Sequence, residues 1–251
     1  MDRRSFIGKT AAAIAGFATT SLANSPLFAN ESNQNNTRNM KKIMIIDGGP
    51  RRNMNTAAMV EKFAEGARAG GAEVKVVRLY DIDYKGCRSC MACQLIGKRV
   101  DSCQYKDGLT DILAECAASD GLVIASPIYY GEITAMARAY WERLTFPWLS
   151  YANGSFSAPK KMPVTFIYTM NGMPENGEDV RKQTMRNVEF MTGLALGHEV
   201  EVIQANNTTQ VNNYAIFDFA DGTAEAKKRW RDEHWEQDLQ KAYDAGKRMA
   251  E

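Results

Sequence analysis

Short apolar runs alternate with longer amphipathic segments along most of this chain. Apolar runs bounded by Gly, Pro and Asn are typical of buried β-strands. The run at 121–126 is apolar throughout, which predicts a strand covered on both faces. The predicted strands span residues 43–47, 73–79, 121–126, 162–168 and 199–203.

The segments between these runs carry apolar residues three or four positions apart, which is the helical period. In the first of them, Ala58, Met59, Phe63 and Ala67 fall on one face of a helix that opens at Asn55. The later predicted helices span about 109–119, 134–144, 179–194 and 224–249.

Strands that alternate with helices predict an α/β fold in which helices cover both faces of a parallel sheet. Five strands suit the doubly wound order 2-1-3-4-5. In such sheets ligands bind at the carboxyl ends of the strands. The loops after the first, third and fourth strands all lie on that edge, so we expect them to converge on one ligand.

The loop between the first strand and the first helix, 48–56, is a candidate anion site. A helix N-terminus offers free backbone N–H groups and the positive end of the helix dipole. The loop lacks the Gly-Lys-Ser/Thr ending of a nucleoside-triphosphate loop and the Gly-x-Gly-x-x-Gly pattern. Its Asn, Thr and Arg side chains suit one small phosphate. The alternative is a plain strand-to-helix turn with an Asn cap.

The amino-acid composition excludes few classes of protein. The chain has 251 residues, of which 45% are hydrophobic and 24% charged, and its net charge is +1. These values are ordinary for a globular protein of one or two domains. No basic stripe indicates nucleic acid as a partner.

The first 29 residues predict a twin-arginine signal peptide. Arg3 and Arg4 precede Phe6-Ile7 and a mildly apolar run, and Leu27-Phe-Ala29 supplies a small-residue cleavage site. The run is too short for a stable membrane span. The alternatives are an N-terminal helix of the domain and an uncleaved membrane tether. Residues 30–40 are polar and predict a disordered lead-in, so the predicted domain is 41–251.

This signal predicts export, to the periplasm or otherwise outside the cytoplasm, by a route that carries folded proteins. A tightly bound prosthetic group would then be assembled before export. The mature chain would work where disulfides persist.

Two loops of this chain resemble motifs of a known family. Gly48-Gly-Pro-Arg-Arg-Asn-Met-Asn-Thr56 resembles Gly-Ser-Pro-Arg-Lys-Asn-x-Asn-Thr, and Ser126-Pro-Ile-Tyr-Tyr-Gly131 resembles Ser-Pro-x-Tyr followed by an aromatic residue. Both are motifs of the flavodoxin-like NAD(P)H-dependent FMN reductases, which include the iron–sulfur flavoproteins. The resemblance covers about residues 41–204.

The resemblance implies FMN as the cofactor. The first loop would hold the phosphate, the second would lie along the isoalloxazine, and a third would close the other edge. One departure is Gly49, which replaces a Ser and removes a hydroxyl donor. For Tyr129 and Tyr130 the alternative role is that of surface aromatics at a strand end. The implied contacts are Gly49, Pro50, Arg51, Asn53, Asn55, Thr56, Pro127, Ile128, Tyr129, Tyr130, Gly131, Asn171 and Gly172.

Four cysteines form the pattern C-x2-C-x2-C-x9-C: Cys87, Cys90, Cys93 and Cys103. A [4Fe–4S] cluster needs four thiolates, and the iron–sulfur flavoproteins have a similar pattern with a shorter last gap. The alternatives are thiols without metal, and disulfides or a zinc site. Cys116 lies in a helical pattern and is expected to be a buried thiol.

The resemblance implies an FMN-dependent oxidoreductase that reduces a flavin, a quinone or another small acceptor, with NAD(P)H as the family's donor. The alternative is an electron carrier that uses FMN and a [4Fe–4S] cluster with protein redox partners. Since relatives form dimers or tetramers, we expect a homo-oligomer. The loops 146–159 and 206–219 are aromatic and long enough to act as lids or as a dimer surface over the flavin.

Overall fold

The computed structural model describes residues 40–97 and 101–251. The predicted signal peptide, 1–29, and nearly all of the predicted lead-in, 30–40, lie outside the described residues. The described part of the predicted domain contains every strand and helix expected from the sequence.

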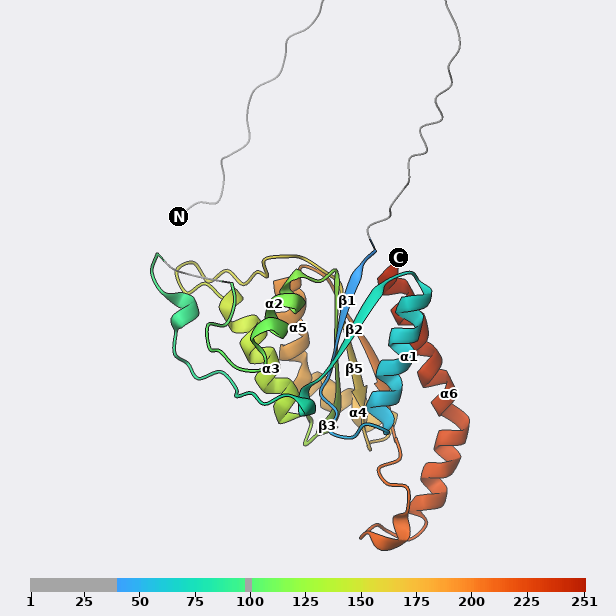
Figure 1. Cartoon of the computed structure of the whole chain (residues 1–251). Helices are drawn as coiled ribbons and strands as arrows, with labels where there is room; N and C mark the ends of the chain where they lie inside the picture. Colours follow the sequence, from blue (N-terminus) through green and yellow to red (C-terminus); the bar gives the residue numbers. More distant parts are fainter. Residues whose placement is uncertain (1–39, 98–100) are drawn as a thin grey trace, which may run out of the picture. The chain divides into compact units, whose positions relative to one another are not determined.

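The domain is built on five parallel strands in the order β2-β1-β3-β5-β6 (Figure 1). Since β5 and β6 are the fourth and fifth parallel strands along the chain, the predicted order 2-1-3-4-5 and the flavodoxin-like α/β class are confirmed. Each pair is in parallel register, as in Ile45 beside Val76 and Val123. The strands are β1 Lys42–Asp47, β2 Glu73–Arg78, β3 Gly121–Tyr129, β5 Val164–Thr169 and β6 Val200–Ala205.

The third strand is longer than predicted and ends in a hairpin. It was expected to stop at Ser126, but β3 runs on to Tyr129 and pairs antiparallel with the short β4, Glu132–Ile133. Tyr130 and Gly131 form the two-residue turn, both with positive φ (52° and 83°). Pro127, which indicated a strand end, is tolerated because it lies near the end of the parallel ladder.

Helices cover both faces of the sheet. α1 (Asn55–Ala69) and α6 (Thr223–Ala250) pack on the face that carries Ile43 and Ile45. On the other face, Met44 and Ile46 are buried beneath three helices, which lie on the opposite side of the sheet from α1 and α6 in Figure 1. They are α2 (Thr110–Ala118), α3 (Ala135–Thr145) and α5 (Arg186–Leu196).

α1 and α6 cross with their backbones in contact. A Cβ atom on Gly66 would lie 1.9 Å from the carbonyl oxygen of Tyr243. A Cβ atom on Gly246 would lie 2.0 Å from that of Phe63. Only glycine fits such a close approach, so these two positions set the depth at which α6 packs on α1.

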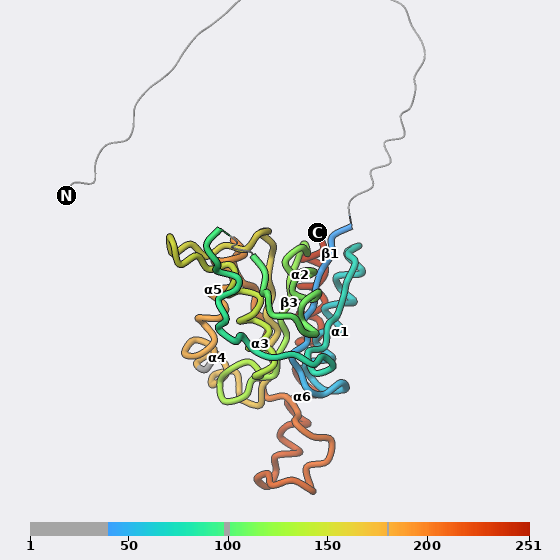
Figure 2. The backbone as a smooth tube through the Cα atoms, turned by 60° about the vertical axis from the view of Figure 1, so that its left-hand side comes forward, coloured from blue at the N-terminus to red at the C-terminus, as the bar shows by residue number. Residues whose placement is uncertain are grey.

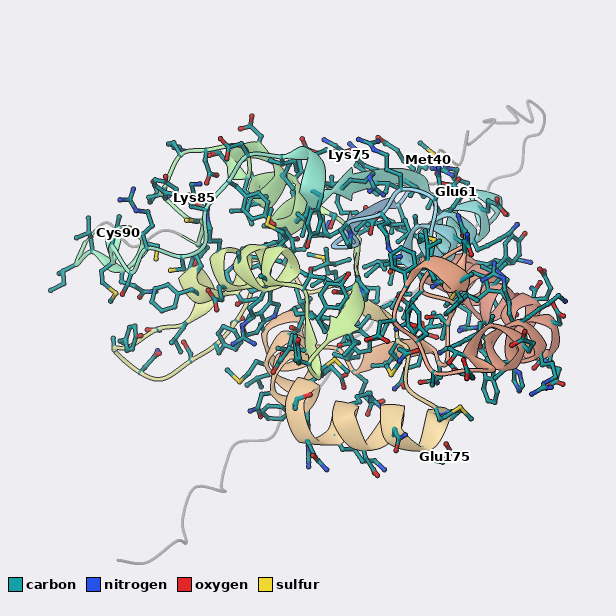
Figure 3. All side chains as sticks on the ribbon, turned by 90° about the horizontal axis from the view of Figure 1, so that it is seen from below. Met40, Glu61, Lys75, Lys85, Cys90 and Glu175 are labelled. Carbon is teal, nitrogen blue, oxygen red and sulfur yellow. The ribbon has the colours of Figure 1, made fainter. Side chains whose placement is uncertain are left out.

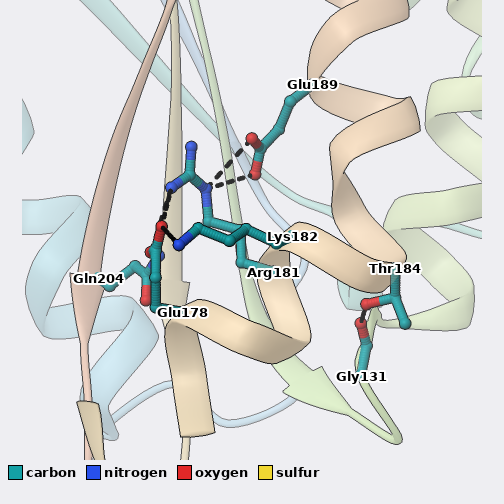
Figure 4. A network of polar contacts seen from close by, with 7 residues as sticks. All are labelled: Gly131, Glu178, Arg181, Lys182, Thr184, Glu189 and Gln204. Carbon is teal, nitrogen blue, oxygen red and sulfur yellow. Dashed lines mark hydrogen bonds and ion pairs between the residues drawn. The ribbon is translucent and has the colours of Figure 1, made fainter. Parts of the chain in front are cut away.

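The fourth helical segment begins earlier than the predicted residue 179. α4 spans Pro174–Val180, because proline is compatible with a first helical turn. A π-helical segment, Arg181–Met185, then leads into α5. In it, Arg181 donates to Glu189 over 3.0 Å, and Thr184 donates to the carbonyl of Gly131 (Figure 4). This segment therefore fixes the turn of the β3–β4 hairpin.

The remaining connections are irregular. The segment between β6 and α6 extends away from the sheet at the carboxyl ends of the strands (orange in Figure 2).

Within the described ranges, no helix is long and apolar enough to cross a bilayer. Short 3-10 turns occur at Leu79–Asp81, Ala92–Gln94, Phe146–Trp148 and Tyr214–Ile216.

Candidate functional site

A cleft opens at the carboxyl ends of β1, β3, β5 and β6, with a cavity volume of about 110 Å³. This is the edge at which the sequence predicted that loops converge. The cleft is lined by Gly49, Pro50, Arg51, Met54, Asn55, Thr56, Pro127, Ile128, Tyr129, Thr169, Met170, Asn171, Thr208, Thr209 and Gln210.

Asp47, the last residue of β1, shapes the first wall of the cleft. Its buried carboxylate accepts hydrogen bonds from the amide of Gly49 (2.8 Å) and from Arg78 Nη1 (2.6 Å). Burial raises the pKa of Asp47 although both contacts oppose that shift. A Cβ on Gly49 would lie 2.9 Å from the Asp47 carboxylate and 3.1 Å from Thr56 Cβ. A larger side chain at position 49 would therefore press on both neighbours.

The N-terminus of α1 faces the same cleft. Asn55 and Thr56 form its first turn, which contains no acidic residue, and no described side chain caps it. The Thr56 hydroxyl lies 2.8 Å from that of Thr169 at the end of β5, which ties the two walls together. Free amide groups at a helix N-terminus, with Arg51 beside them, favour an anion such as phosphate.

Residues 207–210, here called the strap, close the cleft from the β6 side. Thr208 N donates to Met170 O over 2.9 Å. Asn55 Nδ2 donates to the carbonyl of Thr209 over 2.6 Å, and the Arg51 guanidinium donates to that of Gln210. Two predicted phosphate ligands thus also hold the strap in place. The strap lies in the loop 206–219, which the sequence indicated as a lid or a dimer surface, but none of its residues was among the predicted contacts. Its position directly after the fifth parallel strand places it at the same edge.

An apolar hollow continues the cleft along the β3–β4 hairpin. The two share Ile128, Tyr129, Asn171 and Gln210, so they form one groove. Tyr129 is 45% exposed, and Tyr130 at the turn is fully exposed. A groove with a polar, positively charged end and a mainly apolar end suits a phosphate joined to an aromatic ring system.

The structure brings most of the predicted flavin contacts together. Asn53 instead lies in a neighbouring pocket beside Arg231, and Tyr130 lines only the apolar continuation. Gly131 and Gly172 do not line the cleft or its continuation. Nine predicted residues line the cleft: Gly49, Pro50, Arg51, Asn55, Thr56, Pro127, Ile128, Tyr129 and Asn171.

A buried lysine lies behind the third loop of the cleft. Lys227 Nζ donates to the carbonyl of Asn171 over 3.0 Å and to the side chain of Asn207. Burial lowers the pKa of Lys227 to about 8. Lys227 therefore joins α6 to the third loop and to the strap, and adds positive charge behind the cleft.

The residues of the groove fit FMN. Arg51 and the α1 N-terminus suit its phosphate, and the crowded Gly49 lets the backbone approach closely. The hairpin supplies a mainly apolar wall for the ring system.

The four cysteines of the C-x2-C-x2-C-x9-C pattern are free thiols that differ in exposure. Cys87 and Cys90 are exposed, Cys93 is buried and Cys103 is partly buried. Figure 3 shows that Cys90 lies on a loop far from Glu61 of α1. No group of three or more Cys, His, Asp or Glu in residues 40–97 and 101–251 is placed to hold one metal ion. In this arrangement the four thiols are therefore not gathered around one metal position.

Arg143 of α3 anchors the segment that follows the cysteines. It is buried, forms an ion pair with Asp107, and donates to the carbonyls of Lys85 (3.0 Å) and Tyr105 (2.8 Å). Burial opposes ionisation of Asp107, but the hydrogen bonds from Arg143, Leu109 N and Lys85 N together outweigh it and lower the pKa of Asp107. Asp107 also accepts from Leu109 N (3.0 Å) at the start of α2. It is thus a structural residue.

The family of the chain follows from comparison with known proteins. A family model described as NADPH-dependent FMN reductase matches residues 41–207. The chain belongs to this family. The matched range contains both motif loops and all of the predicted contacts, and it ends inside the strap.

Curated relatives of this chain are iron–sulfur flavoproteins. Residues of this chain are 31% identical over 102 residues to an iron–sulfur flavoprotein of Archaeoglobus fulgidus, covering 41% of this chain and 48% of that protein. An iron–sulfur flavoprotein of Methanosarcina thermophila is 29% identical over 102 residues, covering 41% and 51%. The chain therefore spans about half the length of the curated relatives it matches.

Solved structures share the fold. An NAD(P)H:quinone oxidoreductase from Methanothermobacter marburgensis has a TM-score of 0.60 at 16% identity, covering 83% of this chain and 98% of that chain. An FMN-dependent NADH-azoreductase from Bacillus anthracis, in complex with FMN, has a TM-score of 0.56 at 16% identity, covering 84% and 100%.

Proposed function

We propose that this protein is an exported FMN-dependent oxidoreductase that passes electrons from a donor to a flavin, a quinone or another small acceptor. The observation that carries the proposal is the groove at the carboxyl edge of the sheet, which joins a polar end beside Arg51 to a mainly apolar end along the hairpin. Family membership supports FMN as its occupant. Two proteins of the same fold are named as a quinone oxidoreductase and an azoreductase.

The residues of the groove have separate roles in this proposal. Arg51, Thr56 and the first amides of α1 bind the phosphate, and Asp47 holds the loop in the shape that exposes those amides. Ile128 and Tyr129 hold the ring system against the hairpin. Bound FMN supplies the redox chemistry, because it accepts and releases electrons reversibly.

The acceptor would bind where the groove is open. The apolar continuation is bordered by the exposed Tyr130 and by Arg138. An aromatic or conjugated acceptor would stack there on the exposed side of the flavin. NAD(P)H is the donor that the family name supports, and an exported protein would need another donor because the nicotinamide pool is cytoplasmic.

The test is a flavin assay on the full-length protein purified without oxygen from its own host. We expect FMN in a one-to-one ratio with the chain, and bleaching of its visible absorbance when a donor is added with exclusion of oxygen. Protein that neither retains FMN nor binds added FMN would overturn the proposal. If the protein binds FMN but no donor reduces that FMN, the protein is a flavin-binding protein without turnover.

A second candidate is an electron carrier that holds FMN and a [4Fe–4S] cluster. It is favoured by the cysteine pattern and by the iron–sulfur flavoproteins among the relatives. Two residues that flank Cys90, Ser89 and Met91, have positive φ (52° and 58°). Non-glycine residues with positive φ are strained, and such residues are common in functional loops.

Iron and sulfide analysis separates the two candidates. About four irons per chain, with the broad visible absorbance of a cluster, would make the carrier the leading function. FMN without iron would leave the small-acceptor reductase, with the cysteines as thiols or disulfides. Substitution of Cys90 by Ser should abolish the iron signal in the first case and leave the FMN content unchanged.

Export is a proposal that rests on the sequence of residues 1–29. We expect the native protein outside the cytoplasm, with an N-terminus at or near Asn30. Cell fractionation and N-terminal sequencing test this independently of the flavin. A native protein that stays in the cytoplasm with Met1 in place would overturn it, and replacement of Arg3 and Arg4 by Lys should block export.

A further inference from the structure

The apolar hollow along the β3–β4 hairpin has a cation at its border that the proposed flavin site does not use. Arg138 of α3 lines the hollow but not the cleft. The hollow has a volume of about 880 Å³, compared with about 110 Å³ for the cleft. It is therefore large enough to hold a second ring system beside that of the flavin.

The start of α3 fixes the position of Arg138 at the hollow. Ala135 and Arg138 are three positions apart, so they lie on the same face of the helix, and both line the hollow. Thr134 Oγ1 accepts a hydrogen bond from Ala137 N over 3.2 Å and donates to the carbonyl of Gly48 over 2.8 Å. The first turn of α3 is thus capped and tied to the loop after β1.

The guanidinium of Arg138 is held by two neighbours and keeps donors in reserve. Its Nε donates to Glu142 over 3.1 Å, and its central carbon lies 4.9 Å from the centre of the Trp141 ring. Trp141 in turn donates to Thr192 over 2.8 Å. The terminal nitrogens Nη1 and Nη2 donate to no other described residue. A guanidinium held in this way can bind an oxyanion through two parallel hydrogen bonds.

The ion pair with Glu142 leaves Arg138 available to a ligand. The two side chains are 43% and 42% exposed, and they are four positions apart on the same helix. Ion pairs between such exposed side chains contribute little to stability. An oxyanion in the hollow can therefore share the guanidinium with Glu142 at little cost to the fold.

The charges of the hollow give a ligand one preferred orientation. Among the described residues that line the hollow, Glu132 is the one carboxylate. It pairs in register with Tyr129 on the hairpin, whereas Arg138 lies on α3. Because the two charges lie on different elements, a ligand with a single anionic group is favoured when that group faces α3.

We propose that Arg138 selects electron acceptors that carry an oxyanion, such as a sulfonate or a carboxylate, on a conjugated ring system. This inference rests on the proposed function and names the acceptor class of that site. The ring system lies in the hollow along the hairpin, and the oxyanion accepts hydrogen bonds from Nη1 and Nη2 of Arg138. Arg138 determines specificity and takes no part in the electron transfer itself.

The first test measures binding without turnover. FMN-loaded full-length protein is titrated in a calorimeter with naphthalene-2-sulfonate and with naphthalene-2-sulfonamide, a neutral analogue with the same rings. We expect the sulfonate to bind about 5-fold or more tightly, as a charge-assisted contact at a partly exposed site predicts. Arg138→Gln should abolish this preference and leave the affinity for the sulfonamide unchanged.

Arg186→Gln is the matched control, because Arg186 is an exposed arginine at the start of α5 that does not line the hollow. It should keep the preference of the wild type. Arg138→Lys keeps the charge but loses the planar fork, so it should recover part of the preference. A wild type that binds both ligands equally or binds neither, or an Arg138→Gln variant that keeps the preference, would overturn the role of Arg138 while the FMN site stands.

The second test follows electron transfer to an acceptor. FMN-loaded protein is reduced with stoichiometric dithionite and mixed, without oxygen, with 1,4-naphthoquinone-2-sulfonate or 1,4-naphthoquinone. Each quinone takes two electrons and two protons to become the hydroquinone, and the reduced flavin returns to the oxidised form, whose absorbance is recorded. Arg138→Gln should raise the half-saturating concentration of the sulfonated quinone about 5-fold or more, with its limiting rate unchanged.

The unsubstituted quinone separates this inference from the proposed function. Its half-saturating concentration and limiting rate should be the same in the wild type and in Arg138→Gln. If the sulfonated quinone also shows no change in the variant, the Arg138 contact is wrong and the proposed function stands. If neither quinone reoxidises the flavin in the wild type, the proposed reduction of small acceptors is itself overturned.

Discussion

The guanidinium of Arg51 donates a hydrogen bond to the backbone carbonyl of Gln210, which lies 159 positions later in the chain. The contact joins the loop after the first strand to the strap after the last. It places a positive charge at the polar end of the cleft and fixes the strap at the same time. Arg51 therefore combines two roles that the sequence motif alone does not separate.

Arg51→Ala should weaken FMN binding by roughly 10- to 100-fold, since a hydrogen bond to a charged group contributes about 1.5–3 kcal/mol. The measurement is fluorescence titration of flavin-free protein with FMN. Arg52→Ala is the control, because Arg52 is exposed, pairs with Asp81 and does not line the cleft. If both variants lost the same factor in FMN affinity, the overall positive charge of the loop, and not the position of Arg51, would determine FMN binding.

The sheet was predictable because its signals are local. Each apolar run, such as 121–126, is bounded by turn residues, and alternation with helices fixes a parallel arrangement. The convergence of three loops then follows from topology. The hairpin beyond β3 was not predictable, because Pro127 is a local signal for a strand end and its tolerance depends on its position in the ladder.

The strap and the π-helical segment depend on contacts between residues distant in sequence. The strap lies in a polar stretch without periodicity, and its position is set by Asn55, Arg51 and the end of β5. The π-helical segment is held by Thr184 and by the ion pair of Arg181 with Glu189. Neither set of partners can be identified from the local pattern, and for the same reason Gln210 was not among the predicted contacts.

Gly66→Ala should destabilise the domain by about 1–3 kcal/mol, the usual cost of overpacking, because the new methyl group would press on the backbone of Tyr243. Urea unfolding followed by circular dichroism gives the free energy of unfolding. Gly86→Ala is the control, since its Cβ would lie at an ordinary 3.6 Å from Ala139 Cβ. Unfolding midpoints that agree between the two variants would contradict the close helix crossing.

Cys116 should resist alkylation in the folded protein. It is buried in α2, and burial raises the pKa of its thiol to about 12, whereas iodoacetamide reacts with the thiolate. Near neutral pH, in protein treated with a chelator and a reductant, we expect mass spectrometry to find label on the exposed Cys87 and Cys90 first. Cys116 should react only after denaturant is added, and labelling at the same rate as Cys87 would contradict its burial.

Lys227 should make the stability of the protein depend on pH in the alkaline range. The pKa of its ammonium is lowered by burial to about 8, from an ordinary value of 10.5. Between these two values the unfolded chain holds a proton that the folded chain has released. The free energy of unfolding contributed by this group therefore rises from about pH 8 to about pH 10.5.

The comparison with Lys227→Met isolates this effect from other groups that titrate in the same range. The difference in free energy of unfolding, wild type minus variant, should increase with pH between those limits. Lys228→Met serves as the control, because the side chain of Lys228 is 76% exposed and pairs with Asp232. A difference that stays constant with pH for Lys227→Met would mean that its ammonium remains charged in the fold. The positive charge behind Asn171 would then persist at every pH at which the flavin site is assayed.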